Sequence, residues 1–322
     1  MSALHNARTS LPLTNMSLAY MNKLEDFLWF KVAPAVTVKA KSGSIYEYGK
    51  DALRITDTAK ATNGRYNKIN LSVSKSDHYY LESYGLFADV LEQDVENAEA
   101  PINAEMDTAQ MLLQKVMLDG EKKLADSIFS GSVITQNTTL TTTAQWSDYT
   151  TGVSNPITNI NTGINTIRSA TGKLANTLVF GYRAWETFKF HPKILAMFPG
   201  APEITKDMLE SAAKRIFGIK NVYVGAAVHT DTNLGAATET MSDLWTDSCL
   251  VAYIEETPTL KSRTLCVTYV RKAKVQTVVV GKSAIGERAE LEEVYSIIGQ
   301  KIEYDQVIVD AACGYLIIDV NA

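Results

Sequence analysis

Residues 97–129 read NAEAPINAEMDTAQMLLQKVMLDGEKKLADSIF, and this stretch decides most of the fold. Apolar or small residues recur every three or four positions, at Ile102, Met106, Ala109, Leu113, Val116, Gly120, Leu124 and Ile128. That spacing places them on one face of an α-helix, and Pro101 suits a first turn. At 1.5 Å per residue, a helix over about 101–129 is roughly 43 Å long. The sequence therefore predicts one rod-like helix with a buried face.

Upstream of this helix the apolar period changes to two. Residues 36–40 alternate apolar and polar side chains, and residues 69–73 do so again after a polar excursion with three glycines. This pattern predicts a long β-hairpin arm. Because a lone two-stranded ribbon is marginally stable in water, we expect the arm to lie on a partner, which is another copy of the chain.

Helical and strand patterns alternate over the rest of the chain. Residues 17–30 carry apolar side chains at helical spacing, and so do residues after Asn155-Pro156. Further helices are predicted over 182–197, broken at Pro192, and from Thr205 to a stop at Gly218. The expected strands are 177–180, 220–228, 248–254, 264–270, 275–281, 294–298, 301–309 and 314–320. This mixed order indicates an α+β fold.

Composition excludes several classes of protein. The 322 residues include 31 Lys or Arg and 36 Asp or Glu, a net charge of −5 that argues against a cationic surface for gripping nucleic acid. The three cysteines form no metal-binding or disulfide pattern. No apolar run is long enough for a membrane span or a signal peptide. We therefore expect a chain that is made in a reducing cytoplasm.

No catalytic motif can be found in the sequence. Gly281-Lys282-Ser283 follows a predicted strand rather than a glycine-rich loop, so it does not fit a phosphate site. The histidines, at positions 5, 78, 191 and 229, are scattered, and His229 with Asp231 or Asp243 is a weak dyad. Glu121 is interpreted as an exposed helix carboxylate rather than a general base. We predict no enzyme activity, no metal and no cofactor, with a soluble α+β enzyme as the less favoured alternative.

Charge is distributed unevenly between two segments. Residues 31–75 hold nine basic and three acidic side chains, whereas residues 82–114 hold eight acidic and no basic ones. The two runs are either independently solvated faces or surfaces that pair between subunits, where opposite patches fix register. The candidate inter-subunit contact sets Lys39, Lys41, Lys50, Arg54, Lys60, Arg65 and Lys68 against Glu82, Asp89, Glu92, Asp94, Glu96 and Glu99.

Three stretches carry a family resemblance. They are FKVAPAVTV at 30–38, YGLFADV at 84–90 with its continuation through 97–101 to LDGEKKLADSIF at 118–129, and VIVDAACGYLII at 307–318. In this order they resemble the major capsid (coat) proteins of tailed double-stranded DNA bacteriophages, which have the Hong Kong 97-type fold. The family often has Arg before the helix glutamate, where this chain has Gly120.

The resemblance implies four parts. These are an N-terminal arm (1–35), an extended hairpin loop (36–82), a peripheral domain with the spine helix (83–150 and 262–305) and an axial domain (151–261 and 306–322). It further implies hexamers and pentamers in an icosahedral phage head enclosing double-stranded DNA without sequence-specific binding. A separate scaffolding protein and a portal are expected partners, with no membrane involved. The virion would be assembled in the host cytoplasm.

The closest alternative is an encapsulin-like nanocompartment shell, which shares the fold and encloses enzymes. The amphipathic pattern at 17–30 fits the inner-wall helix of such shells, whereas the polar 1–15 extension and the long arm favour a virion. Some relatives join subunits through Lys–Asn bonds. Lys50, Lys60 and Lys68 lie in the arm, but no Asn or Glu partner can be placed, so cross-links are not predicted.

Overall fold

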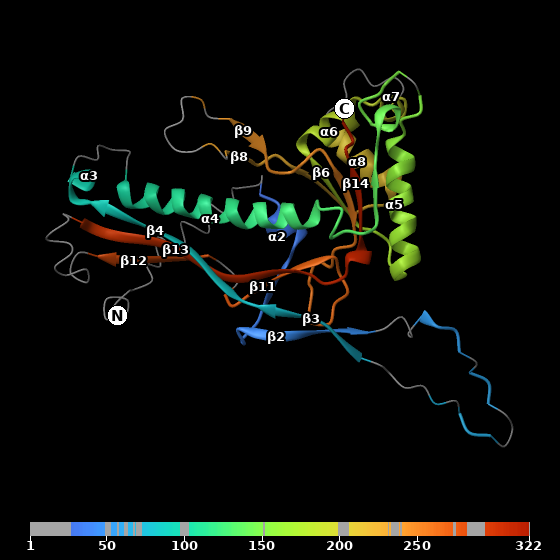
Figure 1. The fold of residues 1–322 in the computed structure, drawn as a ribbon, viewed down its shortest axis with the longest axis horizontal. Helices are drawn as coiled ribbons and strands as arrows, with labels where there is room; N and C mark the ends of the chain where they lie inside the picture. The colour runs from blue at the N-terminus through green and yellow to red at the C-terminus, as the bar shows by residue number, and fades with distance from the viewer. Residues whose placement is uncertain are drawn as a thin grey trace.

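We describe the fold from a computed structural model of the full chain (Figure 1). The description covers residues 27–48, 53–56, 58–60, 64–66, 68, 73–96, 103–150, 152–198, 206–230, 232, 238, 240–272, 275–281 and 294–321. Two sheets dominate these residues, and a long helix runs beside the first. One hydrophobic core joins the first sheet and the long helix to one face of the second sheet, and another lies between the opposite face of the second sheet and its helices. The predicted α+β class is confirmed.

The predicted rod is helix α4 (Ala104–Ile128), 25 residues long. Asn103 caps it by accepting a hydrogen bond from the amide of Met106 (3.0 Å), so the helix begins where its first-turn amides find a side-chain acceptor. Its apolar face packs against strands β4 and β13, and the helix is about 37 Å long. The predicted first-turn Pro101 lies outside the described residues.

The first sheet has five strands. Its order is β1 (Ala35–Thr37), β11 (Cys266–Val270), β13 (Val294–Ile308) and β12 (Gln276–Gly281), with β4 (Glu82–Leu91) also paired to β13. The prediction of separate strands over 294–298 and 301–309 was wrong, because β13 is continuous for 15 residues. Gly299 pairs with Phe87 of β4 on one side and with Val278 of β12 on the other. Because β13 pairs with both neighbouring strands at this position, it stays continuous at the glycine. The short helix α3 (Glu92–Glu96) follows β4.

The second sheet also has five strands. Its order is β5 (Asn137–Thr139), β14 (Gly314–Ile318), β10 (Cys249–Ala252), β6 (Thr177–Gly181) and β7 (Asn221–Gly225). Helices α5 (Pro156–Thr171), α6 (Tyr182–Phe190), α7 (Pro192–Leu195) and α8 (Lys206–Phe217) surround it. The break at Pro192 and the stop at Gly218, whose φ is +65°, are confirmed. The predicted cap Thr205 lies outside the described residues.

Smaller elements complete the fold. Two 3₁₀ turns, η3 (Thr142–Ala144) and η4 (Ala311–Cys313), flank the second sheet, and β8 (Val228–Thr230) pairs with β9 (Met241–Asp243) in a separate hairpin. Strands β4 and β9 were not predicted. Helix α2 (Trp29–Val32) begins anew at Leu28, so the helix predicted over 17–30 does not pass through this point; residues 17–26 lie outside the described residues.

The arm is a hairpin of β2 (Ser42–Tyr48) and β3 (Val73–Tyr80). The prediction that residues 36–40 form one of its strands was wrong. Those residues begin with β1, which joins the first sheet beside β11, and Val38 donates its amide to the Val270 carbonyl oxygen (2.9 Å). This backbone pairing with the body is a long-range contact that an alternating pattern cannot reveal. Residues 69–72 lie outside the described residues.

The base of the arm packs on its own subunit. Ile45, Tyr79 and Leu81 are buried with Val267 and Tyr269 of β11. The rings of Tyr79 and Tyr269 stack with centroids 4.8 Å apart. The expectation that the arm lies on another copy of the chain was therefore wrong for its base. Beyond it the arm extends away from the body in Figure 1.

Candidate functional site

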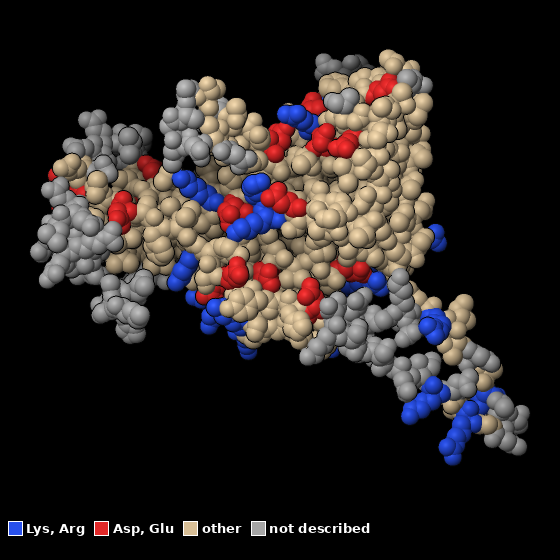
Figure 2. Space-filling model, in the orientation of Figure 1, with Lys and Arg blue, Asp and Glu red and all other residues tan. Residues whose placement is uncertain are grey.

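The outer part of the arm combines exposed apolar side chains with positive charge. Ile55 is 98% exposed, and Leu53 and Tyr66 are also largely exposed. Arg54, Lys60, Arg65 and Lys68 lie in the same part of the arm, and Figure 2 shows basic side chains gathered there. Apolar side chains at the tip of a projecting arm gain about 1.5–3 kcal/mol each when fully buried. This surface is therefore suited to contact with another chain.

The predicted acidic partners lie on β4 and α3. Glu82 and Asp89 are exposed on the strand, and Glu96 is exposed on the helix, where Glu92 is half-buried. In Figure 1, α3 and the outer arm lie at opposite ends of the long axis. Lys50 and Glu99 lie outside the described residues, as does the Asp94 side chain.

The structure thus does not bring the two predicted charge sets together within one subunit. Lys39 and Lys41 are exposed near the base of the arm, and the Lys41 ammonium lies 5.4 Å from the centroid of the Tyr80 ring. Among the ion pairs of the described residues, none joins the outer arm to β4 or α3. A contact between these surfaces would have to form between subunits.

The first sheet leaves an apolar face on the side away from α4. Ser296 and Gln300 of β13 bond to residues of α4, so the alternate residues Tyr295 and Gly299 face the other way. Phe87 lies over Gly299, where a Cβ would overlap its ring, and is 52% exposed. Exposed Leu91 belongs to the same face by strand alternation. The sequence analysis missed this face, although apolar residues in odd and even positions of 84–91 signalled a strand with two apolar sides.

Glu121 of α4 is fully buried, and the prediction that it is an exposed helix carboxylate was wrong. Its Oε1 accepts a hydrogen bond from Trp245 Nε1 (2.6 Å), and its Oε2 accepts one from the amide of Leu28 (2.9 Å) and a longer one from that of Trp29 (3.4 Å). Desolvation by burial raises the pKa of this carboxyl to about 7, although the three hydrogen bonds act to lower it. Glu121 therefore fastens the start of α2 and the segment before β10 to the middle of α4.

Gly120, the residue before Glu121, contributes to the same contact between α2 and α4. Gly120 lies directly under the Trp29 ring, and a Cβ there would overlap it. Trp29 Nε1 in turn donates to Thr268 Oγ1 of β11 (3.0 Å), and Gln306 Nε2 donates to the Gly120 carbonyl oxygen (2.8 Å). Any side chain at position 120 would clash with the Trp29 ring in its present position. The glycine found where the resembling family often has Arg is thus explained by the neighbouring tryptophan.

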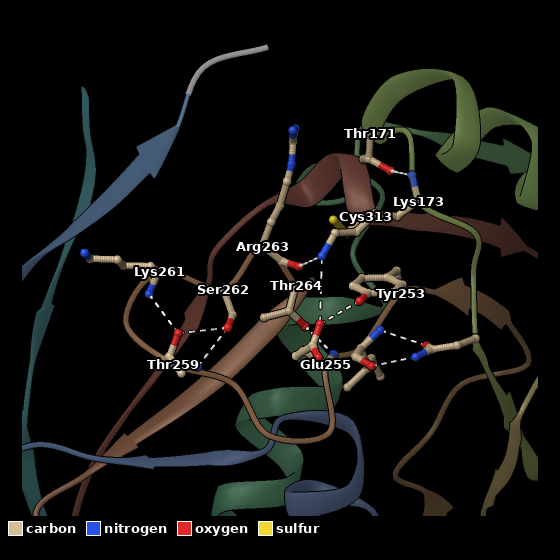
Figure 3. A network of polar contacts seen from close by, with 12 residues as sticks. Thr171, Lys173, Tyr253, Glu255, Thr259, Lys261, Ser262, Arg263, Thr264 and Cys313 are labelled. Carbon is tan, nitrogen blue, oxygen red and sulfur yellow. Dashed lines mark hydrogen bonds and ion pairs between the residues drawn. The ribbon is translucent and has the colours of Figure 1, made fainter. Parts of the chain in front are cut away.

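A polar network holds the two chain segments that connect the sheets (Figure 3). Lys173, which follows α5, donates from Nζ to the Arg263 carbonyl oxygen (3.1 Å) and lies 3.8 Å from Glu255 Oε2. Arg263 lies on the segment from β10 to β11, and its guanidinium pairs with Asp310 on the segment from β13 to β14. The network therefore ties both connections to each other and to the loop between α5 and β6.

Asn176 adds a second tie at this junction. Its Nδ2 donates to the carbonyl oxygen of Ile254 (2.7 Å), and its Oδ1 accepts from the amide of the same residue (2.9 Å). Through these two hydrogen bonds the Asn176 side chain pairs with the backbone of Ile254 as a neighbouring strand would. Such two-sided pairing fixes where the chain leaves the second sheet for the first.

The sequence candidates for other chemistry do not form a site. Residues 276–281 form strand β12, and Lys282 and Ser283 lie outside the described residues. Asp243 is paired with Arg183 (2.8 Å), and Asp231 lies outside the described residues. Within the described ranges no three His, Cys, Asp or Glu side chains gather as metal ligands would. No described helix has the length and hydrophobicity to cross a bilayer.

Known proteins with a similar sequence indicate what kind of protein has this structure. No protein-family model matches the sequence. The chain is 27% identical over 250 residues to the major capsid protein of Burkholderia phage BcepMu, and the alignment covers 75% of each chain. This similarity confirms the sequence-based prediction of a major capsid protein of tailed phages. The predictions of a structural protein of the phage head, located in the virion and not an enzyme, agree with this relative.

Solved structures show the same fold. A phage-related protein from Bordetella bronchiseptica RB50 superposes with a TM-score of 0.70 and 21% identity over 98% of both chains. The mature capsid of bacteriophage PhiM1 gives a TM-score of 0.56 and 14% identity, covering 90% of this capsid protein and 86% of the other chain. The Hong Kong 97-type fold expected from the sequence is confirmed by these neighbours.

Proposed function

We propose that this capsid protein builds an icosahedral head from hexamers and pentamers, and that the outer arm of one subunit lies across β4 and α3 of the next. The observation that carries the proposal is the arm itself, where a 98% exposed Ile55 stands among basic side chains. Helix α3, which carries Glu92 and Glu96 of the proposed receiving surface, lies at the opposite end of the long axis from the outer arm (Figure 1). Surfaces placed in this way join successive copies rather than closing on themselves.

The apolar face of the first sheet supports the same contact. Phe87 and Leu91 flank Asp89 on β4, so the receiving surface offers apolar and acidic groups together. The arm offers Ile55 beside Arg54, which is the complementary combination. Each exposed ion pair contributes only about 0–1 kcal/mol, but the contact is repeated around every capsomer and gains through multivalency.

The two sheets support the proposed division into domains. The first sheet with α4 would form the peripheral domain (83–150 and 262–305), and the second sheet with its helices would form the axial domain (151–261 and 306–322). Residues 1–35 and 36–82 would be the N-terminal arm and the extended loop. Two boundaries fall within structural features: β13 runs past 305 to Ile308, and residues 35–37 belong to the first sheet.

We further propose the partners that such a head requires. A separate scaffolding protein would guide assembly and a portal would occupy one vertex. Double-stranded DNA would be enclosed without sequence-specific binding, which the net charge of −5 supports.

Charge reversal tests the contact between subunits. We expect the triple variant R54E/K60E/R65E to keep the melting temperature of the wild type, because all three side chains are exposed, and to lose shells in negative-stain micrographs. Adding E82K, D89K and E96K to the same chain should restore particles. The matched control R168E/R215E/K261E changes the charge equally on α5, on α8 and in the segment between β10 and β11. Shells from the arm triple as abundant as those of the control would refute the proposed contact.

A further inference from the structure

A groove lies alongside strand β7, at the edge of the second sheet. Among the described residues β7 pairs only with β6, so its other edge meets no described strand. The groove has a volume of about 910 Å³, which is at the upper end of the range for ligand pockets. It is bounded by α2, α6, α7, α8 and β7.

Ten of the 14 residues that line the groove are apolar or aromatic, and the other four are the charged Lys31, Glu186, Lys189 and Glu210. Trp185 and Leu209 form part of its floor, and Phe190, which is 57% exposed, stands with partly exposed Leu195 at its rim. The charged side chains Glu186 and Lys189 pair with each other at 2.6 Å. Such a surface suits an amphipathic segment with an apolar face several residues long.

Leu28 lines the groove and lies near the N-terminal end of the described residues. The residues that precede it in the sequence are therefore candidates for the occupant of the groove. The amides of Leu28 and Trp29 are donated to Glu121, so the backbone hydrogen bonding of α2 starts there afresh, and the preceding segment need not continue the direction of α2.

The preceding residues have the pattern that the groove requires. Leu18, Met21 and Leu24 recur at helical spacing within the 26 residues before the described part of the chain. Met21 is seven residues from Leu28, a span of about 10 Å in a helix and about 23 Å in an extended chain.

We propose that residues 17–26 of the same subunit dock as an amphipathic segment in the groove between β7 and α6. Docking there joins the N-terminal segment to the second sheet, whereas β1 joins the following residues to the first. The N-terminal region would thus act as a strap across both sheets. The contact lies within one subunit and is independent of how subunits meet in the head.

Disulfide trapping in the full chain tests the proposal. The native cysteines Cys249, Cys266 and Cys313 are buried and do not compete for oxidation. Two pairs are introduced separately, M21C/F190C and L24C/L195C, because Phe190 and Leu195 are exposed enough to accept substitution. After mild copper-phenanthroline oxidation at micromolar concentration, we expect at least one pair to form a disulfide within the chain. A shift in non-reducing gels and a cross-linked peptide in mass spectra report it.

The control pair M21C/L174C places the second thiol on an exposed loop that does not line the groove, and should stay reduced. Absence of the disulfide from both groove pairs overturns the proposal, and so does equal trapping in the control pair. Covalent dimers would also overturn it, because they would mean that the segment of another subunit occupies the groove.

Discussion

The buried carboxyl of Glu121 predicts that the fold is more stable at mildly acidic pH than at alkaline pH. Its pKa is raised from 4.5 to about 7 by burial. A group whose pKa is higher in the folded state adds stability below its unfolded pKa, and this contribution is lost as the pH rises through the folded value. Between pH 5 and pH 8 the free energy of unfolding should therefore fall by about 2.5 kcal/mol from this group alone.

The variant E121Q isolates this contribution. Gln has no charge at any pH, so it removes the titration while other groups with shifted pKa values, such as Asp247, Asp305 and His191, titrate in both proteins. The assay is urea unfolding of unassembled subunits at fixed concentration, followed by tryptophan fluorescence at pH 5, 6, 7 and 8. The wild-type free energy of unfolding minus that of E121Q should decrease by about 2.5 kcal/mol from pH 5 to pH 8. A difference that stays constant within about 0.5 kcal/mol would refute the reasoning.

Two further predictions concern packing and the junction between sheets. Gly120→Ala should destabilise the fold by about 1–3 kcal/mol, because the new methyl group overlaps the buried Trp29 ring. Gly299→Ala is the matched control and should cost less, since half-exposed Phe87 can turn away; equal losses of melting temperature would contradict this packing argument. Asn176→Ala should cost about 1–3 kcal/mol by removing two backbone hydrogen bonds, measured by thermal unfolding. An unchanged midpoint would show that water replaces them.

The helices were predictable because their signals are local. Helix α4 lies within the span predicted from its apolar spacing, and the break at Pro192 and the stop at Gly218 follow from single residues with restricted or permissive backbones. Strands β6, β7, β10, β11, β12 and β14 were placed to within a few residues, whereas β2, β4 and β9 were not predicted.

Features that depend on contacts between distant segments of the chain could not be predicted from the sequence. The alternation at 36–38 indicates a strand but cannot show that β1 pairs with β11, which lies more than two hundred residues later. Glu121 resembles any helix carboxylate in sequence, and only the amides of Leu28 and Trp29 and the indole of Trp245 explain its burial. The charge sets of the arm and the acidic strand were recognisable as runs in the sequence. The apolar face around Phe87 could be recognised only once the register of the strands in the sheet was known.

The strand order has a consequence for synthesis of the chain. Strand β13 is the central member of the first sheet, and β14 lies between β5 and β10 in the second. Each of them follows every other strand of its sheet in the sequence, so neither sheet is complete until these late strands have been synthesised. Nascent chains on a polysome therefore lack the finished surfaces that recognise sister copies.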